Sequence, residues 1–240
     1  MIALERGEYE VRPATSADDV SAALALRAQV FRGGSDDGDA FDQRCEHIIV
    51  KNRSGAMVCC FRVLHLSSGR KIEQSYSAQF YGLDRLGEFK ESLLEIGRFC
   101  LAPSVQDPEV LRTAWAALTR YVDQEGIGML FGCSSFAGGR RLDNEATFNL
   151  LAARHLAPDQ WAPAVKAKTT HALTSGRGAL DLKKGMQAMP PLLRTYIAMG
   201  GWVSDHAVID ADLGTLHVFT GLEIGQIPPT RKRLLRALAS

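Results

Sequence analysis

The chain lacks several features that would assign it to a common functional class. Its 28 basic and 27 acidic residues leave a net charge of +1, so no overall charge favours nucleic acid. No apolar run reaches the roughly 18 residues that span a bilayer. No Gly-x-Ser-x-Gly elbow of a serine hydrolase occurs. The first residues carry no basic-then-apolar signal-peptide pattern, so we expect a cytoplasmic protein.

The spacing typical of metal-binding cysteines is also missing. None of the five cysteines forms a Cys-x-x-Cys pair, and all lie in apolar, strand-like segments. We interpret them as buried free thiols of a reducing compartment. A nucleophilic thiolate requires exposure and a nearby positive charge, and only Cys100, two residues after Arg98, meets part of that description. We expect neither a metal nor a redox cofactor.

The most informative stretch is residues 93–111, with the sequence LLEIGRFCLAPSVQDPEVL. Its apolar strand contains both Glu95 and Arg98, and an acid and a base so close together in a buried strand indicate function. The connection to the following helix has no glycine between residues 102 and 110. A loop that binds a nucleotide diphosphate through its backbone amides normally needs glycines. The sequence therefore predicts a site that handles an acyl group without binding a nucleotide diphosphate.

Hydrophobic periodicity and capping signals predict most of the secondary structure. The predicted strands cover residues 9–13, 45–52, 56–66, about 93–101, 129–134, 202–209 and 215–220. The predicted helices cover residues 17–31 after a Ser16 cap, 108–124, 143–155, a segment from Pro190, and the basic tail 230–240. Residues 156–189 read as an irregular basic insertion. This order predicts one α/β domain over residues 1–240, with helices on both faces of a mixed, mostly antiparallel sheet.

The first long helix contains an arginine on its apolar side. Arg27 shares a helical stripe with Val20, Leu24 and Phe31. A guanidinium that faces a core normally has a carboxylate partner or a ligand. The acidic residues 33–39 that follow the helix read as a flexible, solvated loop.

Several segments carry a family resemblance that covers most of the chain. They are residues 26–31 (LRAQVF), Phe41-Asp42 followed by His47, 94–100 (LEIGRFC), 131–136 (FGCSSF), 190–196 (PPLLRTY), 200–204 (GGWVS) and 217–223 (HVFTGLE). With the element order, they resemble GNAT-type N-acyltransferases and, more specifically, bacterial ornithine N-acyltransferases of ornithine-lipid synthesis. The Arg27/Phe31 and Glu95/Arg98 pairs also resemble those of acyl-homoserine lactone synthases.

The resemblance implies a GNAT-like fold and an enzyme with two substrates. It would move a 3-hydroxyacyl chain from an acyl carrier protein thioester to the α-amine of ornithine and form a lyso-ornithine lipid. The donor then presents only a phosphopantetheine arm, which agrees with the glycine-free connection, and no resident cofactor is implied. Synthesis of acyl-homoserine lactones and acylation of another amino acid stay open as alternatives. So does a function of another class, a carrier- or lipid-binding module without catalysis.

Acylation of an amine requires a base that deprotonates the ammonium and a site that holds the amine against the carbonyl. It also requires hydrogen-bond donors that stabilise the oxyanion of the tetrahedral intermediate. Glu95 is the leading candidate base, acting directly or through a water, and an ion pair with Arg98 or Arg27 is its structural alternative. His47 is the second candidate base. Side chains 95 and 98 point to opposite faces of a regular strand. We therefore predict a bulge at Gly97 that brings them to one side and frees backbone N–H groups.

The remaining candidates are assigned to substrate binding. Ornithine requires an acid and a base, which Asp42 with Arg98 or Arg27 could supply, whereas Asp39 reads as part of the solvated loop. Aromatic side chains are candidates for an acyl groove, and two serines after the central helix are candidates for pantetheine contacts. The predicted substrate-binding set is Arg27, Phe31, Asp42, Arg98, Phe99, Ser134 and Ser135.

The basic insertion 156–189 and the basic tail 230–240 suit acidic partners. Acyl carrier protein is one such partner, and the anionic inner face of the cytoplasmic membrane is another. A solvated basic loop is the structural alternative. We expect a cytoplasmic enzyme with peripheral membrane contact.

Overall fold

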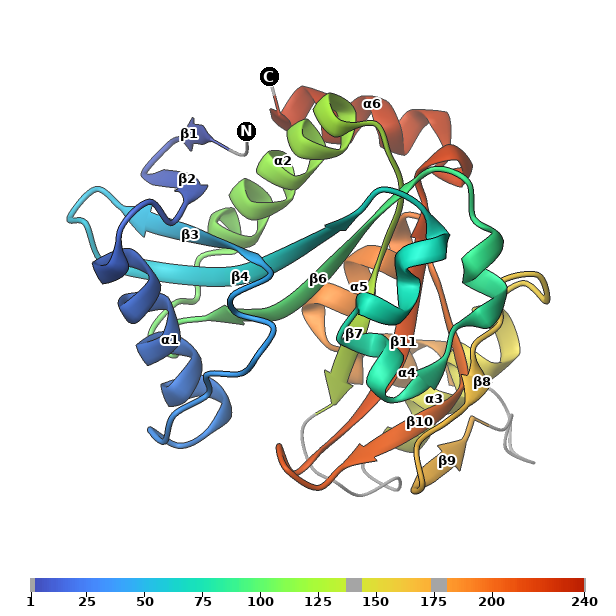
Figure 1. Cartoon of the computed structure of the whole chain (residues 1–240). Coiled ribbons are helices and arrows are strands. Elements are labelled where there is room, and N and C mark those ends of the chain that lie inside the picture. The colour runs from blue at the N-terminus through green and yellow to red at the C-terminus, as the bar shows by residue number, and fades with distance from the viewer. Residues whose placement is uncertain (1–2, 137–143, 174–180, 240) are drawn as a thin grey trace. The chain divides into compact units, whose positions relative to one another are not determined.

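The computed structural model describes residues 3–136, 144–173 and 181–239. They form two units, coloured along the chain in Figure 1. The first unit comprises Met1–His65, Leu94–Gly128 and Pro229–Ser240, and the second comprises Leu66–Leu93 and Met129–Pro228. The predicted start of the helix at residue 143 and residues 174–180 of the insertion lie outside the described residues.

The first unit is built on neighbouring strands that lie in the order β1, β2, β3, β4, β6. The ladders from β1 to β4 are antiparallel. The strands are β1 (Leu4–Arg6), β2 (Tyr9–Pro13), β3 (Glu46–Asn52), β4 (Met57–Leu66) and β6 (Ser92–Leu101). The helices are α1 (Ala17–Phe31), α2 (Pro108–Glu125) and α6 (Pro229–Ala239).

Local chemistry sets the ends of α1. The Ser16 side chain accepts a hydrogen bond from the Asp19 amide and caps the helix, as predicted. The helix ends where Gly33 and Gly34 take φ values of +58° and +100°, which glycine adopts without strain. The predicted apolar stripe is wrong in detail, because Val20 and Leu24 are only half-buried. The buried face consists of Asp19, Ala23, Leu26 and Arg27.

The two faces of this sheet segment carry different residues. Cys60 on β4 contacts the Ala23 carbonyl of α1, so Cys60 and the residue two positions on, Arg62, face α1. Phe61 between them faces the other side. Helix α2 packs against β1 and β2, and α6 runs alongside α2 (Figure 1). Arg236 of α6 donates two hydrogen bonds of 2.9 Å to Asp123 of α2, so the predicted tail helix is confirmed and anchored.

The second unit contains antiparallel strands in the order β7, β11, β10, β9 and a separate β5–β8 pair. The strands are β5 (Tyr81–Gly82), β7 (Ile127–Phe136), β8 (Ala164–Val165), β9 (Thr170–Ala172), β10 (Trp202–Asp210) and β11 (Thr215–Glu223). The helices are α3 (Glu145–Arg154), α4 (Leu182–Ala188) and α5 (Pro191–Ala198). Short 3₁₀ turns cover Gly69–Gln74, Ser77–Gln79, Asp84–Glu88 and Ile224–Gln226.

The insertion contains more regular structure than predicted. Strand β9 pairs with the edge of β10, β8 pairs with β5, and α4 packs on α3. The Lys166 ammonium donates a 2.6 Å hydrogen bond to the Ala78 carbonyl. Strands of two or three residues and a helix of about two turns are too short to produce a clear periodicity, which is why the sequence did not reveal them.

Candidate active site

Arg27 is the centre of an ionic cluster in the first unit. Its side chain is 1% exposed in the middle of α1. Its Nε and Nη2 donate to the Oδ2 and the carbonyl of Asp37, at 2.9 and 2.7 Å. Its Nη1 and Nη2 donate to the carboxylate of Asp42, at 2.5 and 3.2 Å. The predicted carboxylate partner is therefore confirmed, and the Arg27 donors are committed to the protein itself.

Arg62 is a second buried arginine, and the sequence analysis missed it. It lies on β4, where its guanidinium donates to both Asp39 oxygens at 2.6 and 2.8 Å and to Asp42 at 2.7 Å. Burial disfavours the charged guanidinium, but hydrogen bonds to the two carboxylates outweigh it and raise the pKa of Arg62. The argument applied to Arg27, that a core-facing arginine needs a carboxylate, would have identified it.

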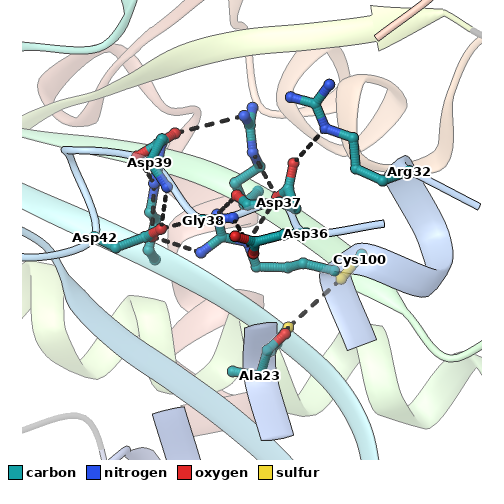
Figure 2. A network of polar contacts seen from close by, with 12 residues as sticks. Ala23, Arg32, Asp36, Asp37, Gly38, Asp39, Asp42 and Cys100 are labelled. Atoms are coloured by element: carbon teal, nitrogen blue, oxygen red, sulfur yellow. Dashed lines mark hydrogen bonds and ion pairs between the residues drawn. The ribbon is translucent and has the colours of Figure 1, made fainter. Parts of the chain in front are cut away.

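The acidic loop after α1 is fixed by this cluster (Figure 2). The Asp37 carboxylate is fully buried and accepts from Arg27, Arg32 and Arg98. Asp39 binds Arg62, and its Oδ2 lies 3.5 Å from Arg98 Nη2. The prediction of a solvated loop is therefore wrong for Asp37 and Asp39. The chain can turn back after a pair of glycines, so that a carboxylate beyond the turn packs against the preceding helix. The spacing of residues in the sequence does not reveal such a turn.

Asp42 has little capacity left to bind a substrate. Its Oδ1 accepts from Arg27 and Arg62, and its Oδ2 accepts from Arg27 and the Asp39 amide. A carboxylate offers about four lone-pair sites, and these four contacts occupy them. Burial raises the pKa of Asp42, but the hydrogen bonds from Arg27, the Asp39 amide and Arg62 lower it to about 2. The geometry gives Asp42 a scaffolding role and does not favour the predicted role as a ligand group.

Strand β6 departs from regular geometry at Arg98. Its φ is +51°, and no other non-glycine residue in the described ranges has a positive φ. A Cβ on Gly97 would lie 3.5 Å from Arg62 Nε, whereas Phe99 stacks on Phe61 with ring centroids 5.1 Å apart. Because Phe61 and Arg62 face opposite sides of β4, Gly97 and Phe99 also face opposite sides. Residues two apart in a regular strand would share a side.

The backbone of β6 is irregular near the predicted position, with the left-handed residue at Arg98 and not at Gly97. The predicted bulge itself stays a prediction, but the contacts bring residues 95 and 98 to one side, as expected. The Arg98 guanidinium reaches Asp37 on the same side that Gly97 presents to Arg62. Glu95, two residues before Gly97, shares that side. Backbone N–H groups freed beside Arg98 for a ligand stay a prediction.

The two candidate bases lie close to this cluster. Glu95 is 5% exposed in β6. Burial raises the pKa of the Cys45 thiol to about 11, and the charge of Arg62 opposes that rise. The charge of Glu95 adds to the rise, so Glu95 lies near enough to Cys45 to act on it electrostatically. His47 is cross-strand partner to Arg62, and its Nε2 lies 3.2 Å from the Asp42 carbonyl. Burial lowers the pKa of His47, which favours the neutral imidazole that a base requires.

The other predicted residues lie in different surroundings. Phe31 is half-buried, and its ring centre is 6.0 Å from the Arg98 Cζ atom. Phe99 faces the side of β6 opposite the ionic cluster, so the structure does not bring it to the candidate bases. Ser134 accepts a 2.9 Å hydrogen bond from Thr220 in the second unit. Ser135 is exposed in the same strand, β7.

One of the protein's own carboxylates already occupies the start of α2. Asp107 caps the helix, with its Oδ1 accepting from the Glu109 amide at 2.9 Å. The Tyr9 hydroxyl donates to its Oδ2 at 2.7 Å. An anion at a helix N-terminus already satisfies the dipole and the free amides there. A nucleotide diphosphate would have to displace Asp107 and approach Glu109.

Two structural features are absent from the described residues. No group of three or more His, Cys, Asp or Glu side chains is placed to hold a metal ion in residues 3–136, 144–173 and 181–239. Across the same ranges, no helix is both long and apolar enough to cross a membrane.

Known proteins resemble this chain in sequence and fold. Residues 26–116 match the family described as acetyltransferase (GNAT) domain. The chain is 29% identical to L-ornithine N(alpha)-acyltransferase of Brucella abortus (strain 2308), over 92% of this chain and 86% of that protein. It is 28% identical to L-ornithine N(alpha)-acyltransferase of Rhodobacter capsulatus, over 88% of each chain. A crystal structure of an uncharacterized protein from Bacillus halodurans aligns with a TM-score of 0.50 and 8% identity, over 97% of this chain and 92% of that chain, a likeness of fold alone. The predicted fold class and family resemblance are confirmed.

Proposed function

Because the chain carries a GNAT acyltransferase domain, we propose that it moves a (3-hydroxy)acyl chain from an acyl carrier protein thioester to the α-amine of ornithine. The product is a lyso-ornithine lipid. The similarity to proteins named L-ornithine N(alpha)-acyltransferase, which extends over 92% of this chain, is the observation that carries the proposal. The ionic cluster and the left-handed Arg98 in β6 support the placement of the proposed site in the first unit.

In this proposal Glu95 acts as the general base. It takes a proton from the ornithine α-ammonium, and the free amine attacks the thioester carbonyl. Backbone N–H groups beside the left-handed Arg98 stabilise the oxyanion. The tetrahedral intermediate collapses, the C–S bond breaks, and Glu95 passes its proton to the pantetheine thiolate. The second proton, which the attacking nitrogen loses as the amide forms, goes to solvent. His47 is the alternative base, since burial keeps it neutral.

We propose acyl carrier protein as the donor because the α2 start disfavours coenzyme A. The connection from β6 to α2 has no glycine, and Asp107 occupies the helix start with Glu109 beside it. A phosphopantetheine thioester brings no adenosine diphosphate to this position. Coenzyme A should therefore inhibit weakly, whereas tight competition between coenzyme A and the acyl carrier protein donor would contradict this part of the proposal.

The direct test combines the purified protein with a 3-hydroxyacyl-loaded carrier protein and ornithine. Release of the carrier thiol and the mass of the acylated product are followed together. We expect Glu95→Gln to lower turnover by roughly 10²–10⁴-fold. Glu91→Gln, an exposed glutamate immediately before β6, is the matched control and should retain turnover. A product formed from another amino acid when ornithine is left out would favour a different amino-acid acyltransferase. Binding of the carrier protein without any turnover would favour the binding module.

We also propose that α6 makes peripheral contact with anionic lipid where the product is delivered. Helix α6 carries four cationic residues and no acid, in a chain whose net charge is only +1. Arg231 and Arg233 are exposed, and Leu234 is 56% exposed between arginines. Such a surface should bind vesicles with anionic lipid, less so as salt rises. Equal binding to uncharged vesicles would contradict it, and carrier protein bound to α6 would assign this surface to the donor.

A further inference from the structure

We propose that Asp37 is a positioning residue that holds Arg98 in its left-handed conformation and thereby keeps the backbone of β6 irregular beside the candidate bases. The proposal rests on the proposed function for its catalytic consequence. It concerns a residue that belongs to no recognised motif of the chain. Its basis is that the buried Asp37 carboxylate forms ion pairs with three arginines of the first unit, which are Arg27 in α1, Arg32 just after α1 and Arg98 in β6.

The contacts of Asp37 divide between the helix and the strand. Its Oδ2 accepts from Arg27 Nε at 2.9 Å and from Arg98 Nε at 3.0 Å. Its Oδ1 accepts from Arg32 Nε at 3.1 Å. The Asp37 side chain is 0% exposed, and the Arg98 side chain is 9% exposed. Hydrogen bonds between charged groups in such dry surroundings are short and directional.

Arg98 needs such a contact because its backbone is strained. Left-handed conformations cost a residue with a Cβ roughly tenfold in population relative to glycine. Strain of this kind persists where surrounding contacts fix it. The Asp37 carboxylate, already fixed by Arg27, holds the Arg98 guanidinium on the side of β6 that Gly97 presents to Arg62. The same contact therefore sets both the direction of the Arg98 side chain and the left-handed backbone at that residue.

Two glycines explain how Asp37 reaches this place. Gly33 and Gly34 take left-handed φ values at the end of α1, and the Gly34 amide bonds to the Ala28 carbonyl. The chain turns back there, so that Asp37 comes under the helix that carries Arg27. Asp36, the preceding residue, is exposed and accepts only a local 2.9 Å bond from the Gly38 amide among the contacts described for it. Asp36 is therefore a natural control for Asp37.

The experiment is a double-mutant cycle between Asp37→Asn and Arg98→Gly, with Asp36→Asn as control. Glycine adopts the left-handed conformation freely, so Arg98→Gly removes the need for the carboxylate. In the wild-type background we expect Asp37→Asn to lower kcat for ornithine acylation by about 10–10²-fold. In the Arg98→Gly background the same change should alter kcat by less than about 3-fold. Its effect on Tm should persist in both backgrounds, because the ion pairs of Arg27 and Arg32 with the Asp37 carboxylate are lost in each.

An equal loss of kcat in both backgrounds would show that Asp37 acts only through general stability, and would overturn the proposal. If Asp37→Asn does not fold, the comparison of Arg98→Gly with Arg98→Ala decides. Neither variant has a guanidinium, so the proposal predicts about tenfold higher kcat for glycine, and equal activity would contradict it.

A second readout does not depend on the substrate. Hydrogen exchange of the amides at residues 97–99 should become faster in Asp37→Asn and stay unchanged in Asp36→Asn. Unchanged exchange in Asp37→Asn would contradict the proposal. If the wild-type protein does not acylate ornithine, this measurement still decides the role of Asp37, so failure of the proposed function and failure of the inference are distinguishable.

Discussion

Replacing Asp42 by asparagine should destabilise the protein in a pH-dependent way while leaving ornithine binding largely intact. The carboxylate of Asp42 receives both Arg27 and Arg62, whose side chains are 1% and 3% exposed. Its pKa is lowered from 3.8 to about 2. This difference corresponds to about 2 kcal/mol of stability at neutral pH. Removing one partner from a buried ion pair costs about 3–5 kcal/mol, which sets the upper range for Asp42→Asn at neutral pH.

The sign of the pH dependence follows from the lowered pKa. The stability from ionised Asp42 is complete above the unfolded value, near pH 4, and is lost as pH falls through about 2. At about pH 3 roughly half of the 2 kcal/mol should remain. The difference between wild type and Asp42→Asn should therefore shrink by about 1 kcal/mol from neutral pH to about pH 3.

Urea unfolding followed by tryptophan fluorescence measures this difference, since Trp115 lies buried in α2 of the same unit. Asp36→Asn is the control and should change the free energy of unfolding by less than about 0.5 kcal/mol. The KM for ornithine, measured under conditions in which Asp42→Asn is folded, should stay within a few-fold of wild type. A difference in stability that does not vary with pH would refute the ion-pair argument, and a large rise in KM alone would restore Asp42 as a ligand group.

Three further predictions follow from the same structure. Burial lowers the pKa of His47 below 6.5, so the stability from its neutral form is lost as pH falls through that lowered pKa; thermal melts of His47→Gln should lack this acid sensitivity. Gly97→Ala should change stability by less than about 1 kcal/mol, because its Cβ would meet Arg62 at 3.5 Å, an ordinary contact, and a greater loss in thermal unfolding would contradict it. Gly221→Ala should cost about 1–3 kcal/mol in the same assay, because its Cβ would lie 2.4 Å from the Trp202 ring; no loss would contradict that contact.

Elements with strong local signals could be predicted from the sequence. Strand β2 has the predicted bounds, Tyr9–Pro13, and α1 begins after its Ser16 cap. Helix α2 starts at Pro108, where proline fits the first turn of a helix. Strands β8 and β9 could not be predicted, because two or three residues carry no period and their pairing depends on distant strands.

The candidate site was predictable only where a single residue conflicts with its surroundings. Arg27 on an apolar stripe required a carboxylate, and Glu95 with Arg98 required an irregular strand. The sequence could not reveal that Asp37 is the carboxylate that joins α1 to β6, because Arg98 lies 61 residues away along the chain. Glycine seemed the natural residue for the irregular position, but ion pairs to Asp37 allow arginine to occupy it.

The positions of the two acidic candidates, Asp39 and Asp42, also depend on long-range contacts. Asp39 was assigned to a solvated loop, as acidic loops commonly are, and Asp42 was assigned to substrate binding. Their burial depends on Arg62, which lies on β4, the second strand of the hairpin that follows the loop. Long-range pairing of charges is set by the tertiary fold, so composition and local spacing cannot assign it.

Mass spectrometry of lipid extracts from a heterologous host that expresses the chain tests the central claim most directly. The account predicts a new lipid with the mass of ornithine plus one hydroxyacyl chain, absent from cells that express Glu95→Gln and present with Glu91→Gln. Short acylated lactones in the medium, with no such lipid, would contradict the substrate assignment while leaving the acyltransferase fold intact. Neither product from a folded, well-expressed protein would contradict the proposed reaction.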